Sequence, residues 1–363
     1  MHKFNLFFIT NTHIIVSRGV KNEKNITIQD IANELGLSRN TVSKALNGGH
    51  LPEKTKTLVI NKAKEMNYKN LNVSETKIKQ NNYKILLLSG KPLNNMNFFL
   101  PIMRGIDNYC YENNYELLRY TFNNNISSYE TLYNYIVNLD IDGIIAIETF
   151  DKEFITKLLD FNIPVTFIDF CSHTTQINGH YDIIETSNRE PIYHICKILN
   201  KKYNITKFSF VGDYSHCMSF QNRYLGMLQA LLLSNIPHKK SDDILMTDAF
   251  DYGNPKMLAT KILNLSVMPE CFICANDFIA RSLINALKIL NLNVPNDALV
   301  VGYDDAVDST SSRPTITTVG MDKDFLGIEA VKTLVNRINN PTMPMREITL
   351  NSKIIPREST RNK

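Results

Sequence analysis

The polar side chains that follow Ser38 have the types and the spacing needed to read DNA. If Ser38 caps a helix, Arg39 and Asn40 stand in its first turn and Lys44 lies about one turn further along the same side. Arginine and lysine donate hydrogen bonds to guanine, and asparagine pairs with adenine. Short hydroxyl and amide side chains suit phosphate oxygens. The candidate DNA contacts are Thr27, Ser38, Arg39, Asn40, Thr41, Ser43, Lys44 and Asn47.

Residues 26–68 contain three short helical patterns that would position these side chains. The first follows Thr27, which forms a capping-box pattern with Asp30, and it ends at Gly36. The tight turn into Ser38 then predicts a helix-turn-helix, whose second helix lies in the major groove. A three-helix cluster with polar outer faces would show similar spacing, so the pattern alone leaves this alternative open. We expect a helix-turn-helix DNA-binding domain at 26–68.

The charge of the chain is unevenly distributed. Residues 1–80 hold 13 Lys and Arg against 6 Asp and Glu, whereas the remainder holds 27 against 30. This asymmetry indicates that only the N-terminal part meets a polyanion, although a solvated basic surface would look the same. Residues 1–25 are interpreted as an N-terminal extension without a signal peptide, and we hypothesise that translation begins at Val20. No stretch approaches the roughly 20 apolar residues of a membrane span.

The segment 69–82 is polar and is expected to be a linker. The residue pattern of the chain changes after it. Apolar strand-like runs alternate with amphipathic helical patterns throughout 83–357. The expected strands lie within 84–88, 115–120, 142–147, 164–169, 207–213, 270–277 and 298–305. Alternation of this kind predicts parallel sheets with helices on both faces. The segment exceeds the usual size of one compact core, so we predict an α/β domain of two doubly wound parallel-sheet lobes.

Cysteine usage and motif content limit the chemistry of the chain. Cys271 and Cys274 form a C-x-x-C within a run that predicts a buried strand, without a second pair at zinc-like spacing. We therefore expect reduced core cysteines, no metal site, no cofactor and a cytoplasmic location. The chain lacks G-x-G-x-x-G, a P-loop, G-x-S-x-G and H-E-x-x-H, which argues against an enzyme. An exported sugar-binding protein is a second rival interpretation.

The run ITIQDIANELGLSRNTVSKALNGG, followed by PEKTKTLVINKAKEMNY, resembles the headpiece of the LacI/GalR (lactose-repressor) family. The resemblance covers the whole headpiece and implies that Arg39, Asn40 and Lys44 read bases. It also implies a homodimer on a near-palindromic double-stranded operator, with one headpiece per half-site. The linker departs from the family pattern, because Asn70 stands where proline is expected and no A-R-x-L follows. Ile78 is the nearest apolar candidate for a minor-groove wedge.

The remainder of the chain resembles the ligand domain of the same family, which has the fold of periplasmic sugar-binding proteins. The landmarks are IPVTFIDF, SFQNRYLG, CANDFIA and VPNDALVVGYDD. Polar groups at the carboxyl ends of strands suit ligand binding in open α/β sheets, and carboxylate, guanidinium and amide groups suit the hydroxyls of a sugar. The implied ligand contacts are Phe98, Asp169, Ser219, Arg223, Tyr252, Asn276 and Asp304.

Each ligand assignment has a structural alternative. Asp304 could cap a strand end, Arg223 could be a surface helix charge, and Phe98 and Tyr252 could pack in the core. The expected function is that of a transcriptional repressor whose operator affinity is controlled by a small effector, with a sugar as the expected effector. A purine or a sugar phosphate is the alternative, because Thr186-Ser187-Asn188 replaces the family's usual Asp-Asn pair.

Overall fold

The computed structural model describes residues 26–46, 51–66, 68, 82–90, 96–122, 126–171, 177, 179–245 and 252–360. The chain divides into two compact units, Met1–Gln80 and Asn81–Lys363, and each is treated by itself. Several sequence predictions fall outside the described residues: the extension 1–25, Asn47, and the linker 69–82 apart from Asn82. Asn70 and Ile78 belong to that linker.

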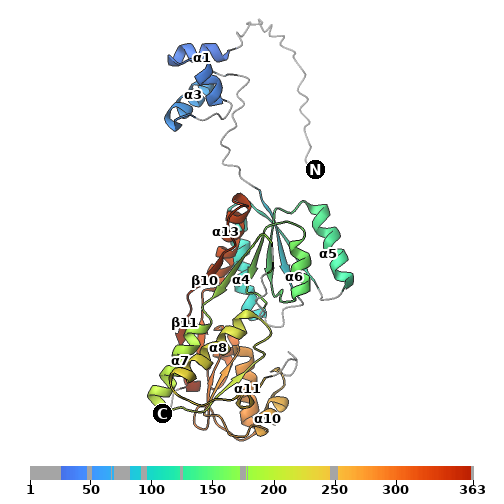
Figure 1. The fold of residues 1–363 in the computed structure, drawn as a ribbon, viewed down its shortest axis with the longest axis vertical. Coiled ribbons are helices and arrows are strands. Elements are labelled where there is room, and N and C mark those ends of the chain that lie inside the picture. Colours follow the sequence, from blue (N-terminus) through green and yellow to red (C-terminus); the bar gives the residue numbers. More distant parts are fainter. Residues whose placement is uncertain are drawn as a thin grey trace, which may run out of the picture. The chain divides into compact units, whose positions relative to one another are not determined.

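The smaller unit is helical. Its described helices are α1 (Ile28–Leu35), α2 (Arg39–Leu46) and α3 (Glu53–Glu65) (Figure 1). The capping box at α1 forms as predicted, because the hydroxyl of Thr27 accepts the N–H of Asp30 at 3.3 Å and Asp30 Oδ2 accepts the N–H of Thr27 at 2.7 Å. Gly36 ends α1 at a φ of 63°, a left-handed conformation that glycine adopts without strain. The helices bury a common core of Ile31, Ala32, Val42, Ala45, Leu46, Val59 and Ala63.

The larger unit contains a six-stranded parallel sheet in the order β10-β5-β4-β3-β1-β2. Its strands are β1 (Lys84–Ser89), β2 (Glu116–Thr121), β3 (Gly143–Ile147), β4 (Val165–Ile168), β5 (Tyr181–Thr186) and β10 (Glu347–Leu350). Alternate residues of a strand point to opposite faces. Accordingly Ile85 and Leu87 of β1 join one hydrophobic cluster, whereas Leu86 and Leu88 join another. Both faces of this sheet are therefore covered by apolar side chains.

Helices pack against both faces of this sheet and complete the two hydrophobic clusters. The described helices of this lobe are α4 (Met96–Glu112), α5 (Ile126–Leu139), α6 (Lys152–Leu159) and α13 (Lys323–Asn339). Ile102 of α4 and Leu334 of α13 pack with Ile85 and Leu87, whereas Ile155 of α6 belongs to the opposite cluster. In Figure 1 α4 and α13 accordingly lie on one side of the sheet, and α5 and α6 lie on the other. This is the doubly wound arrangement that strand–helix alternation predicts.

The second lobe is built on a smaller parallel sheet in the order β6-β7-β8. Its strands are β6 (Phe208–Val211), β7 (Cys271–Cys274) and β8 (Leu299–Val301), and an antiparallel pair joins β9 (Thr318–Gly320) to β11 (Lys353–Ile355). The described helices of this part are α7 (Arg189–Tyr203), α8 (Met218–Leu233), α10 (Pro255–Leu263), α11 (Asp277–Ile289) and α12 (Val307–Ser311). Short 3-10 turns, η1 (Lys240–Asp242) and η2 (Glu358–Thr360), complete the lobe.

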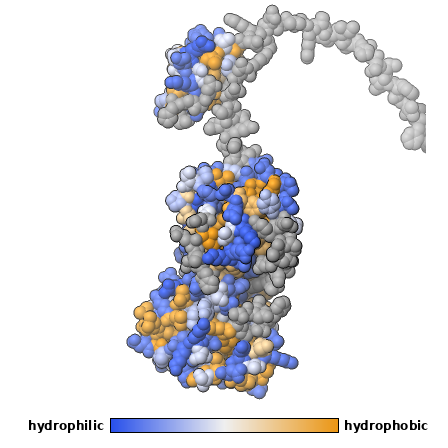
Figure 2. Space-filling model, turned by 45° about the vertical axis from the view of Figure 1, so that its right-hand side comes forward, coloured by the Kyte–Doolittle hydropathy of each residue, from blue (hydrophilic) through white to orange (hydrophobic). Residues whose placement is uncertain are grey.

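The chain passes between the lobes more than once. After β9 it returns to the first lobe through α13 and β10, where β10 pairs with β5, and then β11 goes back to pair with β9. All seven predicted strands are present, and the predicted fold class of a helical headpiece followed by two parallel-sheet lobes is confirmed. The prediction missed β5, β9, β10 and β11. On the face drawn in Figure 2, hydrophilic and hydrophobic residues are mixed over both units.

Candidate DNA-reading helix and ligand cavity

Helix α2 separates its polar and apolar residues cleanly. Val42 is fully buried with its apolar neighbours, whereas Arg39, Asn40 and Lys44 are exposed. Ser38 begins this helix as predicted, because its hydroxyl accepts the N–H of Thr41 at 3.1 Å. Within the described residues, Arg39 and Lys44 form no ion pair and α2 has no acidic residue in its first turn. This face of α2 can therefore offer two cationic groups and one amide to a polyanion.

The remaining candidate DNA contacts differ in how free their side chains are. The hydroxyl of Thr27 donates to Asp30 Oδ2 at 2.7 Å and so belongs to the α1 cap. The hydroxyls of Ser38 and Thr41 lie 2.8 Å apart and hydrogen-bond to each other. Ser43 is half-buried. Backbone capping thus already uses part of this hydroxyl set, and the exposed Arg39–Asn40–Lys44 group is the better-placed part of the candidate interface.

A cavity that is partly open to solvent lies between the carboxyl ends of the strands of the two lobes. Ligands commonly bind at this place in α/β folds. The first lobe contributes Phe98, Phe99, Glu148, Phe150, Ile168, Asp169, Glu185 and Thr186. The second lobe contributes His216, Cys217, Ser219, Phe220, Arg223, Asn276 and Asp304, and the segment that returns to the first lobe contributes Met321 and Leu326.

Three of the four carboxylates of this cavity stand on unusual backbone. Glu148 directly follows β3, Asp169 directly follows β4, and Asp304 comes shortly after β8. Their φ angles are 56°, 64° and 100°, in the left-handed region that residues with a Cβ rarely adopt. Strained conformations of this kind can mark binding sites, because the surrounding structure must stabilise them. Gly90, at the end of β1, allows this approach, since a Cβ there would lie 2.3 Å from the carbonyl oxygen of Glu148.

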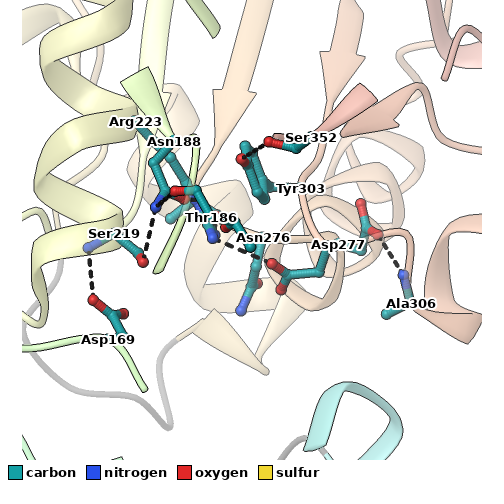
Figure 3. A network of polar contacts seen from close by, with 12 residues as sticks. Asp169, Thr186, Asn188, Ser219, Arg223, Asn276, Asp277, Tyr303, Ala306 and Ser352 are labelled. Atoms are coloured by element: carbon teal, nitrogen blue, oxygen red, sulfur yellow. Dashed lines mark hydrogen bonds and ion pairs between the residues drawn. The ribbon is translucent and has the colours of Figure 1, made fainter. Parts of the chain in front are cut away.

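Arg223 of α8 is the centre of a buried polar network. Only 3% of it is exposed, which excludes the alternative of a surface charge. Its Nε donates to Asn188 Oδ1 at 2.9 Å (Figure 3). Its Nη1 donates to the carbonyl of Ala275 at 2.5 Å, and its Nη2 lies 3.3 Å from Asp304 Oδ1. Its guanidinium also stacks over the ring of Tyr303 at 3.6 Å. The network fixes the Arg223 side chain at the cavity wall.

Asp169, Ser219 and Asn276 are held by hydrogen bonds with backbone and side-chain groups. Asp169 Oδ1 accepts the N–H of Ser219 at 3.1 Å, so the first residue after β4 is linked to the start of α8 (Figure 3). The Ser219 hydroxyl accepts from Asn188 Nδ2 at 3.1 Å. Asn276 Oδ1 caps α11 by accepting the N–H of Ile279 at 3.0 Å, so its Nδ2 is not used by the cap. Each of these residues also lines the cavity.

The structure places the two predicted aromatic contacts in different surroundings. Phe98 is half-buried, lines the cavity and packs edge-on against Phe99 with ring centroids 4.9 Å apart. Tyr252 is only 6% exposed and belongs to the hydrophobic core of the second lobe, and it is not among the described residues that line the cavity. Tyr252 therefore fits the core-packing alternative, because its ring packs with the apolar residues that surround the small sheet.

The cavity is more acidic than the sequence prediction implies, because Glu148 and Glu185 also line it. Burial, reinforced by the nearby charge of Asp169, raises the pKa of each of these two carboxyl groups to about 7. Burial also raises the pKa of Asp304, although the Arg223 guanidinium opposes this change. The signal for Glu148 was present in the sequence, since it follows a predicted strand in the same way as Asp169.

His216 also lines the cavity, and burial lowers the pKa of its imidazole. In the part of the chain that the structure describes, no group of three His, Cys, Asp or Glu side chains is arranged to hold a metal ion. All six cysteines are buried and none forms a disulfide. Over the same described residues, the search for a helix long and apolar enough to cross a membrane finds none.

Comparison with known proteins relates both units to one kind of protein. Residues 201–360 match the periplasmic binding protein-like domain family. The chain is 26% identical over 341 residues to the HTH-type transcriptional repressor PurR of Pasteurella multocida (strain Pm70), covering 93% of this chain and 99% of that protein.

Two solved structures show the same fold. The transcriptional regulator CelR in complex with cellobiose aligns with a TM-score of 0.66 at 19% identity, covering 92% of this chain and 99% of that one. The lac repressor dimer bound to operator and the anti-inducer ONPF aligns with a TM-score of 0.63 at 20% identity, covering 93% and 99%.

Proposed function

Because this chain belongs to the LacI/GalR (lactose-repressor) family of transcription regulators, we propose that it is a repressor whose operator affinity is set by a small ligand bound in the cavity. The observation that carries this proposal is the presence in one chain of a capped helix with exposed Arg39, Asn40 and Lys44 and of a two-lobed domain with a polar cavity. We further propose a cytoplasmic homodimer that binds a near-palindromic double-stranded operator, and no catalytic role.

The DNA-binding step rests on the composition of the exposed face of α2. Arg39 and Lys44 donate to guanine O6 and N7, and the amide of Asn40 pairs with adenine. Ser43, Thr41 and Ser38 are suited to phosphate contacts, together with the N–H groups at the start of the helix. Base contacts decide which sequence is bound, whereas phosphate contacts add affinity that weakens with salt.

The ligand step rests on the polar groups that line the cavity from both lobes. Asp169 lies on the first lobe, whereas Arg223, Asn276 and Asp304 lie on the second, so a ligand that contacts both sets favours one closure angle. A closure angle preferred by ligand changes the spacing of two paired headpieces, and the ligand and DNA affinities are then coupled reciprocally. A sugar fits the mixture of carboxylate, amide and guanidinium groups, and a purine or a sugar phosphate is the alternative effector.

The proposal is tested by selecting bound fragments from sheared genomic DNA at two salt concentrations. The native protein should retain specific fragments at the higher salt, and a variant with Arg39, Asn40 and Lys44 all replaced by Ala should lose that preference. Lys54→Ala, which removes an exposed charge from α3, serves as the control and should keep it. Replacing Arg39 alone should relax the preference at one base pair by about 1–3 kcal/mol. Full sequence preference in the triple variant would refute the assignment.

The ligand link is tested separately by measuring operator affinity with and without a saturating ligand found by calorimetric screening. A bound ligand raises the melting temperature of the native protein, so the screen needs no knowledge of the operator. An operator affinity that stays the same with bound ligand would remove the coupling and leave the DNA-binding assignment intact.

A further inference from the structure

The described wall of the cavity is strongly unbalanced in charge. It carries four carboxyl groups, on Glu148, Asp169, Glu185 and Asp304, and one guanidinium, on Arg223. Glu148 and Glu185, whose pKa values are about 7, are partly ionised at pH 7, and a bound cation would favour their charged forms. A wall of this kind attracts cations and repels anions, and the partly enclosed, low-dielectric setting strengthens both effects. The imbalance constrains which chemical class of ligand the cavity accepts.

The guanidinium is already engaged by protein groups. Each of its three nitrogens has a partner within the protein: Asn188, the carbonyl of Ala275, and Asp304. A second described cation near the cavity is Lys323, whose Nζ donates to the carbonyl of Asp305 at 3.2 Å and lies 5.9 Å from the centroid of the Phe98 ring. A phosphate or carboxylate on a ligand would thus face four acidic side chains against two described cations, of which Arg223 is already held by protein groups.

Two of the acidic side chains have fewer hydrogen-bond donors than acids in a protein interior normally have. Asp304 is 4% exposed, and its Oδ1 accepts no hydrogen bond from the described residues, since Nη2 of Arg223 lies 3.3 Å away without hydrogen-bond alignment. The described residues provide no hydrogen bond or ion pair for the Glu148 side chain either. An unpaired buried acceptor is costly, so a ligand that supplies donors would stabilise Asp304. The half-buried carboxylate of Glu148 lines the same cavity and could accept from the same ligand.

The acids share the cavity with aromatic rings. Phe98, Phe99, Phe150 and Phe220 line it together with the neutral form of His216 that burial favours. An aromatic face attracts a cation through its quadrupole, and it also covers the apolar face of a sugar ring. Carboxylates and aromatic rings together suit an ammonium group, which carries a positive charge and three N–H donors.

We propose that the effector is a polyhydroxylated amine of the amino-sugar or aminoalditol class, whose ammonium group lies between Glu148, Asp304 and the aromatic wall. This inference rests on the proposed function and narrows its ligand class, disfavouring the sugar phosphate. The hydroxyl groups of such a ligand would meet Asp169, Asn276 and Ser219. Glu185 adds a further acidic group to the same wall, and among the described residues its carboxylate receives one long hydrogen bond, of 3.4 Å, from Asn188 Nδ2.

The test is isothermal titration calorimetry of the full chain at pH 7. The probes are 2-amino-2-deoxyhexoses and 1-amino-1-deoxyalditols of the gluco, galacto and manno series. Each is compared with its neutral parent, its N-acetyl derivative and its 6-phosphate. We expect at least one amine to bind ten times more tightly than its neutral parent and its N-acetyl derivative, because both of these lack the positive charge. The phosphate should bind more weakly than the amine that bears no phosphate.

The variant Glu148→Gln keeps the shape of the side chain and removes its charge. It should reduce the preference for the amine over its neutral parent by at least fivefold. If Glu148→Gln folds poorly, Glu185→Gln is measured in its place and should change the preference in the same direction. Glu153→Gln removes an exposed carboxylate on α6, paired with Lys157, and should leave the preference unchanged. Calorimetric melting without ligand verifies that each variant is folded.

The proposal is overturned if no amine binds, if every amine binds no more tightly than its neutral parent, or if a 6-phosphate binds best. The genomic-fragment selection, run on the same protein without ligand, separates this outcome from failure of the proposed function. Specific fragments with no amine preference would refute only the ligand class. An amine preference without specific fragments would refute the repressor assignment and leave the ligand inference standing.

Discussion

The carboxyl group of Glu148 makes the stability of the larger unit depend on pH in a predictable direction. Burial, together with Asp169 and Asp304, raises its pKa from 4.5 to about 7 in the folded protein. The folded protein therefore binds this proton more tightly than the unfolded chain does. Stability falls as pH rises from about 4.5 to about 7, and the full cost applies above that range.

The expected size follows from about 1.4 kcal/mol for each pH unit between the folded and unfolded pKa values. Ionised Glu148 should destabilise the native protein by roughly 1 kcal/mol at pH 5 and by roughly 3 kcal/mol at pH 8. Glutamine cannot ionise and has nearly the same shape. Glu148→Gln should thus gain on the order of 2 kcal/mol more at pH 8 than at pH 5.

The chain has no tryptophan, so unfolding in urea is best followed by far-UV circular dichroism at the two pH values. Glu153→Gln is the matched control, because Glu153 is exposed and its pKa is lowered by a hydrogen bond from Lys157. The control should show no gain at pH 8. An equal change for Glu148→Gln at both pH values, or a loss of stability at pH 8, would refute the reasoning.

Three further substitutions test contacts that stabilise the larger unit or the headpiece, and each is measured by urea unfolding. Arg223→Ala should cost about 3–5 kcal/mol, because Asp304 would stay buried without its cation, and adding Asp304→Asn should recover part of the loss. Gly90→Ala should cost about 1–3 kcal/mol, since its methyl group would meet the carbonyl oxygen of Glu148. Thr27→Ala should cost the headpiece about 1 kcal/mol by removing the α1 cap. Unchanged unfolding in any of them would show that the named contact does not stabilise the native state.

The sequence missed strand β5 for a reason that the structure makes clear. Its segment Tyr181–Thr186 contains Asp182 and Glu185, which break the apolar run that marks a buried parallel strand. Asp182 is fully buried, and its carboxylate pairs with Arg337 of α13 and with Arg346, 2.9 Å away. Both arginines are more than 150 residues distant along the chain. A charge inside a strand is tolerated only when tertiary partners neutralise it.

The sequence by itself determined the features that depend on near neighbours along the chain. The cap of α1 joins Thr27 to Asp30, and the cap of α2 joins Ser38 to Thr41, so both are written in spacings of three residues. The strands β1, β3 and β7 were equally clear, since each is a short apolar run ended by turn residues. The exposed face of α2 follows from the same helical period.

Only the tertiary structure decided how the cavity is composed. Glu148, Asp169 and Asp304 come from three separate strand ends, and the order of strands in two sheets brings them together. Arg223 is buried because α8 places it against Tyr303 and Asp304. Tyr252 packs in the hydrophobic core of the second lobe and not in the cavity. Burial and long-range charge depend on distances across the fold, and the spacing of residues along the chain does not encode these distances.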